Sequence, residues 1–321
     1  MAASAERQVP VVLDLGQIQA QDLEAMLEEE TGTWRKELDW DFRPSAELVR
    51  RFVDVHALNG YVLLIDDEVA GYSYYVCEEY KGLVGDLYVR KKYRTADNEH
   101  RLLGAVVDHL IGARYVKRIE SQLVLARSLE PRLLPGASYA RSYPRYFMAV
   151  DAAVGARLPA RGLEDVVLDQ WTERWQEETA HLIASAYRGH IDSEINDQYR
   201  SAAGARRFLF NIVQHPGCGT FFEPAACVAV RESTGKLCGA SLTSLVAAEA
   251  GHVTQICVAP ALKGQGVGYE LLRRSLGVLA RSGAKTVSLT VTAANREAVR
   301  LYERVGFRIV RRFSAFVWEG F

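Results

Sequence analysis

Residues 251–272, in the C-terminal half of the chain, read GHVTQICVAPALKGQGVGYELL. An apolar run leads to Pro260, a glycine-rich string follows at 263–268, and a helical pattern begins directly after it. Glycines allow a tight backbone turn, so several N–H groups can converge where the helix starts. Together with the positive end of the helix dipole, this geometry suits a pyrophosphate. The alternative is a plain turn that joins a strand to a helix.

The chain contains the same order of elements twice. Residues 61–89 and 228–258 each begin with an apolar strand, continue through a polar turn and then show two more strands. Gly71 and Gly239 open the second strands and are 168 residues apart, whereas Gly82 and Gly251 open the third strands and are 169 apart. Alternating apolar residues and turn chemistry predict antiparallel strands in both stretches. An internal repeat is therefore the basis of the fold.

The elements that follow keep one order in both halves. We expect a helix over 98–116 and 266–282, a strand over 121–125 and 286–292, a further helix, and a closing strand over 146–150 and 313–318. Upstream, each half has one strand, over 11–15 and 166–168, and two helical segments. The sequence thus predicts an α+β protein with two tandem domains, each a mixed, mostly antiparallel twisted sheet flanked by helices. The expected boundaries are 1–150, a linker at 151–163, and 164–321.

The loop and its flanking elements resemble the acetyl-CoA-binding segment of the GNAT superfamily of N-acetyltransferases. The pattern of that segment is Arg/Gln-x-x-Gly-x-Gly/Ala after a strand that ends in V-x-P. Lys263 stands where Arg or Gln is usual. Lysine keeps the positive charge but lacks the planar fork of arginine, so we expect little harm to phosphate binding. The resemblance implies acetyl-CoA as co-substrate, no metal, and a loop site formed by Lys263, Gly264, Gln265, Gly266, Val267, Gly268 and Tyr269.

A second segment, downstream, carries the same resemblance. Residues 295–307 read NREAVRLYERVGF, which is similar to the superfamily's N-x-x-A-x-x-L-Y-x-x-x-G-F. Two segments in the right order make a specific signal that covers about 155 residues of the C-terminal half, and the N-terminal half only in outline. A nucleotide-binding P-loop needs GxxxxGK[ST], and a Rossmann fingerprint needs GxGxxG after the first strand of a βαβ unit. The glycine-rich loop fits neither pattern.

Amide formation from a thioester requires a neutral amine. An alkyl amine with a pKa near 10.4 is mostly protonated, and removing its proton at pH 7 costs about 4–5 kcal/mol. A base with a pKa near 7 is therefore useful, and His252 is the candidate, eleven residues before Lys263. Related histone acetyltransferases have a glutamate at the matching place and serotonin N-acetyltransferase has a histidine. The alternative is a strand histidine that is satisfied by a neighbouring group.

Tyr302 matches the general acid of the superfamily, although it could equally face a core beside Leu301 and Val305. A phenol near pKa 10 protonates a thiolate near 8.5 uphill by roughly 2 kcal/mol, so a hydrogen bond to the departing sulfur is the better expectation. Asn295 could bond the pantetheine arm or cap the helix that begins after it. The resemblance also places pantetheine and the thioester carbonyl at the main chain of Ile256, Cys257 and Val258. We expect no covalent intermediate on Cys257.

The two halves differ in the residues that carry chemistry. At the offset of 169, His252 corresponds to Leu83 and residues 263–266 correspond to 94–97, which read RTAD. At the offset of 168, Asn295 corresponds to Arg127 and Tyr302 to Leu134. The N-terminal half is therefore expected to be a degenerate GNAT copy that helps to shape the substrate cleft. This arrangement resembles that of tandem members of the superfamily.

Residues 186–199 read AYRGHIDSEINDQY and lie between the first two helical stretches of the C-terminal half. In the superfamily this connection commonly borders the acceptor site. Its acidic and tyrosine side chains could receive a cationic amine, and we name Asp192, Glu194, Tyr187 and Tyr199. The alternative is an ordinary polar surface loop.

Bulk composition limits the remaining options. Thirty-nine basic and forty acidic residues give a formal net charge of -1, which disfavours a nucleic-acid partner. The five cysteines show no CxxC or metal-ligand spacing, so reduced thiols in a cytoplasmic protein are expected. The N-terminal residues lack the apolar core of a signal peptide, and no stretch approaches eighteen apolar residues. A fused repeat makes a monomer plausible, and a homodimer is possible.

These observations lead to one main hypothesis and two others. The main one is an acetyl-CoA-dependent N-acetyltransferase that acts on the primary amine of a small molecule by direct transfer. A protein N-terminal or lysine acetyltransferase is the second. A non-catalytic acyl-CoA-binding sensor is the third, and an intact His252 and Tyr302 argue against it. A screen for thiol release with amines, amino acids, aminoglycosides and peptides separates the three.

Overall fold

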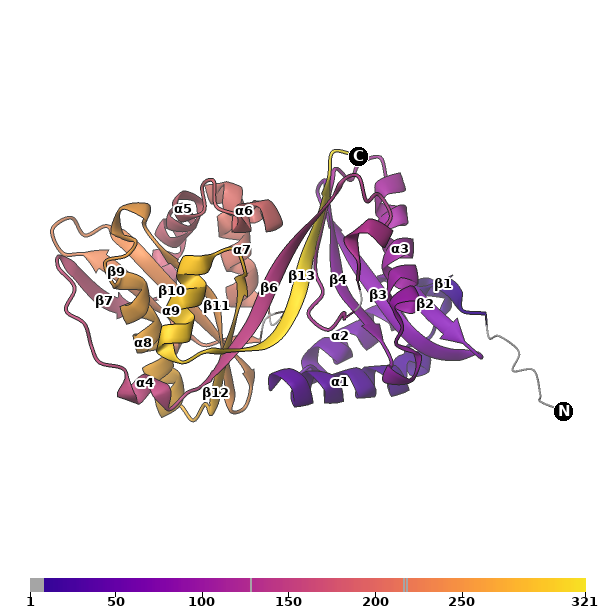
Figure 1. Ribbon diagram of the computed structural model, residues 1–321, viewed down its shortest axis with the longest axis horizontal. Helices are drawn as coiled ribbons and strands as arrows, with labels where there is room; N and C mark the ends of the chain where they lie inside the picture. Colours follow the sequence, from indigo (N-terminus) through magenta and orange to yellow (C-terminus); the bar gives the residue numbers. More distant parts are fainter. Residues whose placement is uncertain (1–8, 128, 216, 218) are drawn as a thin grey trace. The chain divides into compact units, whose positions relative to one another are not determined.

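The computed structural model describes residues 9–127, 129–215, 217 and 219–321. The chain forms two compact units (Figure 1). Unit 1 contains the chain up to Arg35, together with Phe42–Tyr143 and Phe313–Phe321, and unit 2 contains Lys36–Asp41 and Pro144–Arg312. The division differs from the expected domains 1–150 and 164–321, because two long strands each begin in one unit and end in the other. One of the five cysteines, Cys218, lies outside the described residues.

The sheet of unit 1 is mostly antiparallel. Its first four strands pair in chain order, and a fifth runs parallel to the fourth. The last part of β13 (Arg308–Glu319) pairs antiparallel with that fifth strand. The strands are β1 (Val11–Asp14), β2 (Asn59–Ile65), β3 (Glu68–Glu78), β4 (Lys81–Val89), β5 (Arg118–Gln122) and β13 (Arg308–Glu319).

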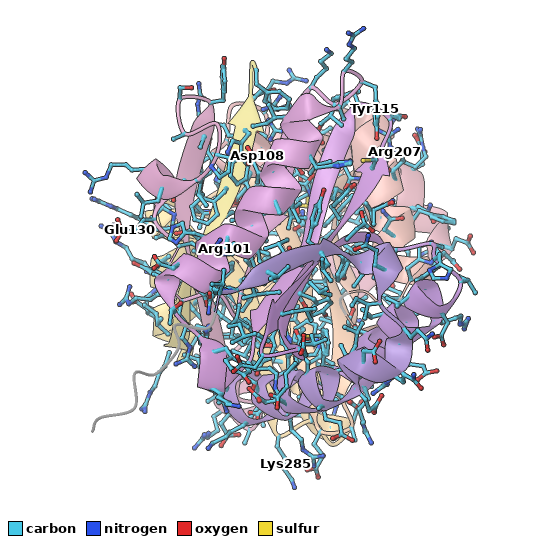
Figure 2. The ribbon with its side chains drawn as sticks, turned by 90° about the vertical axis from the view of Figure 1, so that its right-hand side faces the viewer. Arg101, Asp108, Tyr115, Glu130, Arg207 and Lys285 are labelled. Atoms are coloured by element: carbon cyan, nitrogen blue, oxygen red, sulfur yellow. The ribbon has the colours of Figure 1, made fainter. Side chains whose placement is uncertain are left out.

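Helices cover both faces of this sheet. On α3 (Ala96–Gly112), Leu103, Val106 and Leu110 are fully buried against the strands, whereas Arg101 and Asp108 point outward (Figure 2). Each such buried side chain contributes about 1.5–3 kcal/mol. The other face carries α1 (Glu24–Leu38), whose Thr33 hydroxyl lies 3.0 Å from the Tyr88 hydroxyl of β4, followed by α2 (Arg43–Asp54).

Unit 2 repeats this plan. Four antiparallel strands are followed by a fifth, which runs parallel to the fourth. Residues Arg145–Asp151, from an earlier part of the chain, pair antiparallel with that fifth strand. The strands are β7 (Val166–Gln170), β9 (Cys227–Arg231), β10 (Leu237–Ala247), β11 (Ala250–Val258), β12 (Thr286–Thr292) and β6 (Ala140–Asp151), and the short β8 (Thr220–Phe221) pairs with β10.

Two pairs of helices pack on opposite faces of the sheet of unit 2. On one face, α8 (Val267–Arg281) and α9 (Arg296–Val305) form a core with β11, β12 and β6. On the other face, α5 (Gln176–Ala186) and α7 (Ala202–Gln214) pack on β9, β10 and β11. The short helices α6 (Asp192–Ile195) and α4 (Val154–Arg157) complete the unit.

Strand registers confirm the internal repeat residue by residue. In unit 1 the parallel pairs run from Lys81–Arg118 to Val84–Ser121, and in unit 2 they run from Ala250–Thr286 to Val253–Leu289. These pairs follow the offsets of 169 and 168 derived from the glycines. Each unit also has an extra residue in its bulged strand at the same place, Gly85 in β4 and Thr254 in β11.

Two sequence-based expectations are wrong. The order of elements predicts that the strands near 146–150 and 313–318 close the sheets of their own halves, but Arg145–Asp151 pairs in unit 2 and Ala315–Glu319 pairs in unit 1. The apolar alternation that predicts a strand does not name its partner. The further helix of the first half is, in the described residues, only the 3-10 turn Pro131–Leu133. Pro131 and Pro135 interrupt helical hydrogen bonding there, and Gly136 has a φ of 59°.

None of the helices in the described part of the chain combines the length and the apolar character that a membrane span requires.

Candidate active site

The candidate site of unit 2 begins where two parallel strands stop pairing. β11 and β12 pair from Ala250–Thr286 to Val253–Leu289, and both strands then continue, β11 along β10 and β12 along β6. Beyond this point the facing edges have main-chain groups that pair with no strand of the described chain. An extended ligand with amide groups can add to such an edge, as peptides do in β-augmentation.

A bulge brings polar side chains to one face of β11. Gly251 and Val253 lie under α8, since a Cβ on Gly251 would meet Leu279 at 2.9 Å. Cys257 packs with α5 on the opposite face. The extra residue at Thr254 shifts the alternation between these two parts of the strand. His252 and Gln255, three residues apart, therefore both lie on the α5 face.

His252 is buried between aromatic rings. Its Nδ1 lies 2.8 Å from the Ser288 hydroxyl on β12, and its ring centroid lies 5.2 Å from that of Trp40 and 6.0 Å from that of Phe147. Burial lowers the pKa of His252 to about 4, so the imidazole is neutral at neutral pH. A direct proton transfer from an alkylammonium of pKa 10.4 to this ring costs about 9 kcal/mol. His252 stays the predicted base, but its surroundings make it a weak one.

Tyr302 lies on α9 with its ring 5.8 Å from the ring of Phe307 and is 6% exposed. Burial raises the pKa of Tyr302, and the charge of Asp192 raises it further. The phenol is therefore protonated at neutral pH and has an O–H hydrogen to donate. Its place in the core agrees with the packing alternative, and its proximity to Asp192 agrees with the predicted role at the reaction centre.

The acceptor segment is brought to the end of β12 by Asp192. One carboxylate oxygen of Asp192 accepts a hydrogen bond from the Thr292 hydroxyl, and the other lies 3.4 Å from Nδ1 of His190. Thr292 is the last residue of β12, on the part of that strand that pairs with β6 but no longer with β11. The predicted acidic residue thus lies beside the strand gap, whereas Glu194 of the same helix is exposed.

Tyr187 reaches the facing edge of β11. Its hydroxyl donates to the Ile256 carbonyl at 3.3 Å and lies 3.5 Å from Oε1 of Gln255. Its ring stacks on Tyr199 with a centroid distance of 4.6 Å. Burial raises the pKa of Tyr187, as do the charges of nearby groups including Asp192. Tyr187 and Asp192 are therefore close to one another, and the Tyr199 ring packs against the ring of Tyr187.

The glycine-rich loop has the conformation that the sequence predicts. Gly264 and Gly266 have φ values of 79° and 91°, a region that favours glycine, and Gly266 is the N-cap of α8 without any side-chain cap. In the described chain, the first-turn N–H groups of Val267, Gly268 and Tyr269 donate to no other group. Lys263 and Gln265 are exposed at this helix start.

Some predicted loop residues are structural. Val267 is 2% exposed and belongs to the core, and the Tyr269 hydroxyl donates to the Pro159 carbonyl at 2.9 Å, which fastens the segment before β7. The ring of Tyr269 is also covered by the Arg161 guanidinium at 4.3 Å. The side chains of Val267 and Tyr269 therefore hold the loop in place, and only their main-chain N–H groups are left without an acceptor in the described chain.

The remaining predicted residues have identifiable environments. Asn295 caps α9, since its Oδ1 accepts from the Ala298 N–H at 3.2 Å. Burial raises the pKa of Cys257 to about 12, so its thiol is protonated and a poor nucleophile. Ile256 and Val258 lie on the same strand as Cys257 and are half-buried. In the described chain, no group of three or more His, Cys, Asp or Glu side chains could hold a metal ion.

Sequence reasoning missed several groups around these residues. Trp40 comes from the N-terminal half, is fixed near β10 by the hydrogen bond from the Asp41 N–H to the Val246 carbonyl, and gave no local signal. Ser288 and Thr292 read as ordinary strand residues. Gln255 did give a signal, because it is a polar residue in an otherwise apolar part of the strand.

Comparison with known proteins now gives the family. Residues 163–307 match the sequence model of the acetyltransferase (GNAT) family. A mycothiol acetyltransferase of Thermobispora bispora is 30% identical to the chain over 255 residues, which cover 77% of this chain and 79% of that protein. Alignments with two other mycothiol acetyltransferases cover only 30% and 27% of the length of those relatives.

Solved structures show the same architecture. A GCN5-related N-acetyltransferase from Sphaerobacter thermophilus has a TM-score of 0.66 at 20% identity, with 97% of this chain and 95% of that chain covered. A tandem GNAT protein from the clavulanic acid biosynthesis pathway has a TM-score of 0.58 at 15% identity, with 97% and 98% covered. These likenesses concern the fold, and they confirm the predicted tandem α+β architecture. The chain belongs to the acetyltransferase (GNAT) family.

Proposed function

We propose that unit 2 transfers an acetyl group from acetyl-CoA directly to the primary amine of a small molecule. The observation that carries this proposal is the start of α8, where Gly266 caps the helix without a side chain and three N–H groups have no acceptor in the described chain. The positive end of a helix dipole and free N–H groups suit a pyrophosphate. The exposed Lys263 adds a positive charge at the same place.

The thioester arm of the co-substrate fits the unpaired edge of β11. Its amide groups would pair with main-chain groups of residues 256–258, where β11 no longer contacts β12. The Ile256 carbonyl accepts from the Tyr187 hydroxyl, a donor from outside the sheet, which supports this placement. An acetyl group at the end of such an arm would lie between β11 and the end of β12.

The acceptor amine would approach from the side of Asp192. A carboxylate that is held by Thr292 and lies beside Tyr302 attracts a cationic amine to the reaction centre. The amine must lose a proton before its nitrogen attacks the thioester carbon. His190, 3.4 Å from Asp192 and half-buried, and the neutral His252 are the two imidazoles near this path.

The transfer itself forms a C–N bond and breaks the C–S bond of the thioester. The proton from the nitrogen leaves to a base or to water, and the sulfur departs as a thiolate that is later protonated. Because burial raises the pKa of the Tyr302 phenol, a full proton transfer to the sulfur is more uphill than roughly 2 kcal/mol. Tyr302 therefore acts best by donating a hydrogen bond to the developing thiolate.

A thiol-release screen tests this function. Wild-type protein with acetyl-CoA is assayed against small amines, amino acids, aminoglycosides and peptides. The proposal expects release with at least one small amine and formation of its N-acetyl product by mass spectrometry. Acetylation of peptides alone would favour a protein acetyltransferase. Tight acetyl-CoA binding without thiol release from any acceptor would mean a sensor, and the proposal would be wrong.

A further inference from the structure

Gln255 is a buried polar side chain that the mechanism above does not use. It lies on the α5 face of β11 and is 6% exposed. Its Oε1 lies 3.5 Å from the Tyr187 hydroxyl, a long contact, and its Nε2 is buried without any hydrogen-bond partner. Leaving such a donor unpaired costs about 1–3 kcal/mol, so an apolar residue would give a more stable strand. The unpaired N–H₂ group calls for a partner that comes from outside the protein.

The corresponding residue of unit 1 shows how the fold satisfies this position when no ligand is needed. At the offset of 169, Gln255 corresponds to Asp86 of β4, which follows the same bulge. Asp86 accepts from the Leu87 N–H at 2.7 Å and lies beside Glu30 of α1. Its partners are therefore internal. Unit 2 keeps a polar side chain at this position, whose Oε1 is contacted by the Tyr187 hydroxyl at 3.5 Å and whose Nε2 has no acceptor in the described chain.

Three groups around Gln255 belong to the candidate acceptor site. Tyr187 contacts both Gln255 and the Ile256 carbonyl at the unpaired edge of β11. Asp192 lies close enough to Tyr187 for its charge to act on the phenol. An amine held at Asp192 would therefore bring its neighbouring atoms toward the Gln255 carboxamide. The N–H₂ group is a donor, so the matching ligand atom is an oxygen with a free lone pair.

We propose that Nε2 of Gln255 donates a hydrogen bond to an oxygen atom of the acceptor, so that the enzyme selects amines with a hydroxyl or carbonyl group close to the amino group. This inference rests on the proposed function and narrows its substrate class. A site that is built to hydrogen-bond a substrate group rejects the analogue without it, because the buried donor is again left unpaired. We expect at least about tenfold discrimination in kcat/KM.

Matched pairs of amines test the inference. Ethanolamine is compared with propylamine, and glycinamide with isobutylamine, in the thiol-release assay with wild type, Gln255→Met and the exposed control Gln214→Met. Wild type and the control should prefer the oxygen-bearing member of each pair by tenfold or more. Gln255→Met should lose that preference by a fall in kcat/KM for the oxygen-bearing amines, with the alkyl amines within about twofold. A preference that survives in Gln255→Met overturns the inference.

Thermal unfolding of the free protein provides a readout that needs no turnover. Replacing an unpaired buried donor by an isosteric apolar side chain should raise the Tm of Gln255→Met by roughly 2–4 °C, whereas a structural role would lower it. A lower Tm together with an equal loss of activity for all amines would make Gln255 a packing residue. Failure of the wild type to acetylate any amine contradicts the proposed function, and the Tm shift still decides whether the Gln255 donor is unpaired.

Discussion

The starts of α3 and α8 occupy equivalent places in the two units, but only the start of α3 has a side-chain cap. In α3, the Thr95 hydroxyl accepts from the Asn98 N–H at 3.2 Å, and the buried Glu99 carboxylate accepts from the Arg127 N–H at 3.1 Å. Arg94, the counterpart of Lys263, donates to the Val89 carbonyl at 2.8 Å. At α8, Gly266 has no side chain, Lys263 is exposed, and the first-turn N–H groups find no acceptor in the described residues.

This difference shows how a repeat can lose a binding site without losing its fold. In unit 1 the Thr95 hydroxyl accepts from one first-turn N–H group, that of Asn98, whereas the helix start of unit 2 has no side-chain cap and an exposed Lys263 beside it. The first turn of α3 also contains Asp97 and Glu99, whose charges would repel a phosphate. Strand pairing, bulges and the helix on the sheet are the same in both units. The comparison predicts that only unit 2 binds an anionic ligand at its helix start.

A side chain that blocks the start of α8 should reduce acetyl-CoA binding more than any other change proposed below. Gly266→Asp places a carboxylate at the N-cap of α8, where it would bond the free N–H groups and repel a pyrophosphate. Acetyl-CoA affinity, measured by calorimetry, should fall at least about 100-fold, or about 2.7 kcal/mol. Gly266→Ala imposes the same strain at a φ of 91° without the charge, so its acetyl-CoA affinity should fall far less.

Removal of the phenol of Tyr302 is expected to act on the chemical step. Tyr302→Phe keeps the ring against Phe307 but cannot donate to the sulfur. The value of kcat should fall roughly 10–100-fold, with the KM for acetyl-CoA nearly unchanged. Tyr139→Phe, an exposed tyrosine of unit 1, should keep full activity. A Tyr302→Phe enzyme at the wild-type rate would assign Tyr302 to the core alone.

His252 gives a pH-dependent effect on stability. Its pKa of about 4 in the folded state is below the unfolded value near 6.5, so the unfolded state binds a proton first as pH falls. The contribution of the neutral His252 to the free energy of unfolding is fully present above about pH 6.5 and decreases between pH 6.5 and 4. Urea unfolding at pH 5 should show a loss of about 2 kcal/mol relative to pH 7 that is absent in His252→Gln. The exposed His181→Gln control should keep the wild-type loss.

The pair Glu30 and Asp86 predicts a smaller effect of opposite sign in unit 1. Burial raises the pKa of Glu30, with a contribution from Asp86, and burial also raises the pKa of Asp86. This stability is present below the unfolded pKa values near 4 and is lost as pH rises through the folded ones. Glu30→Gln should stabilise the protein at pH 8 by about 1 kcal/mol and less at pH 5. An equal change at both pH values would show that the pKa of Glu30 is not raised in the folded state.

Much of this comparison could be predicted from the sequence. Strands and helices, the 168 and 169 offsets, and the loss of the glycines at 94–97 follow from local patterns. The turn at Asp66 and Asp67 even shows the positive φ values, 54° and 59°, that tight hairpins require. Asp192 is named as an acceptor residue because of the family resemblance of its segment, and its interaction with Tyr302 is visible only in the folded chain.

The parts that failed depend on contacts between residues distant in sequence. No local pattern shows that Trp40 covers His252, and this burial is what lowers the pKa of the imidazole to about 4. The exchange of closing strands between β6 and β13 has the same cause, since each strand has the alternation to join either sheet. The internal partners of Thr95 and Glu99 likewise appear only in the folded chain.

The stoichiometry of acetyl-CoA binding tests whether the start of α8 is the single anion-binding helix start of the chain. Calorimetry of the full chain should show one site per chain, and that site should be lost in Gly266→Asp and kept in Thr95→Gly. Two sites per chain, or a single site that Gly266→Asp leaves intact, would contradict the assignment of the anion-binding helix start to α8 alone.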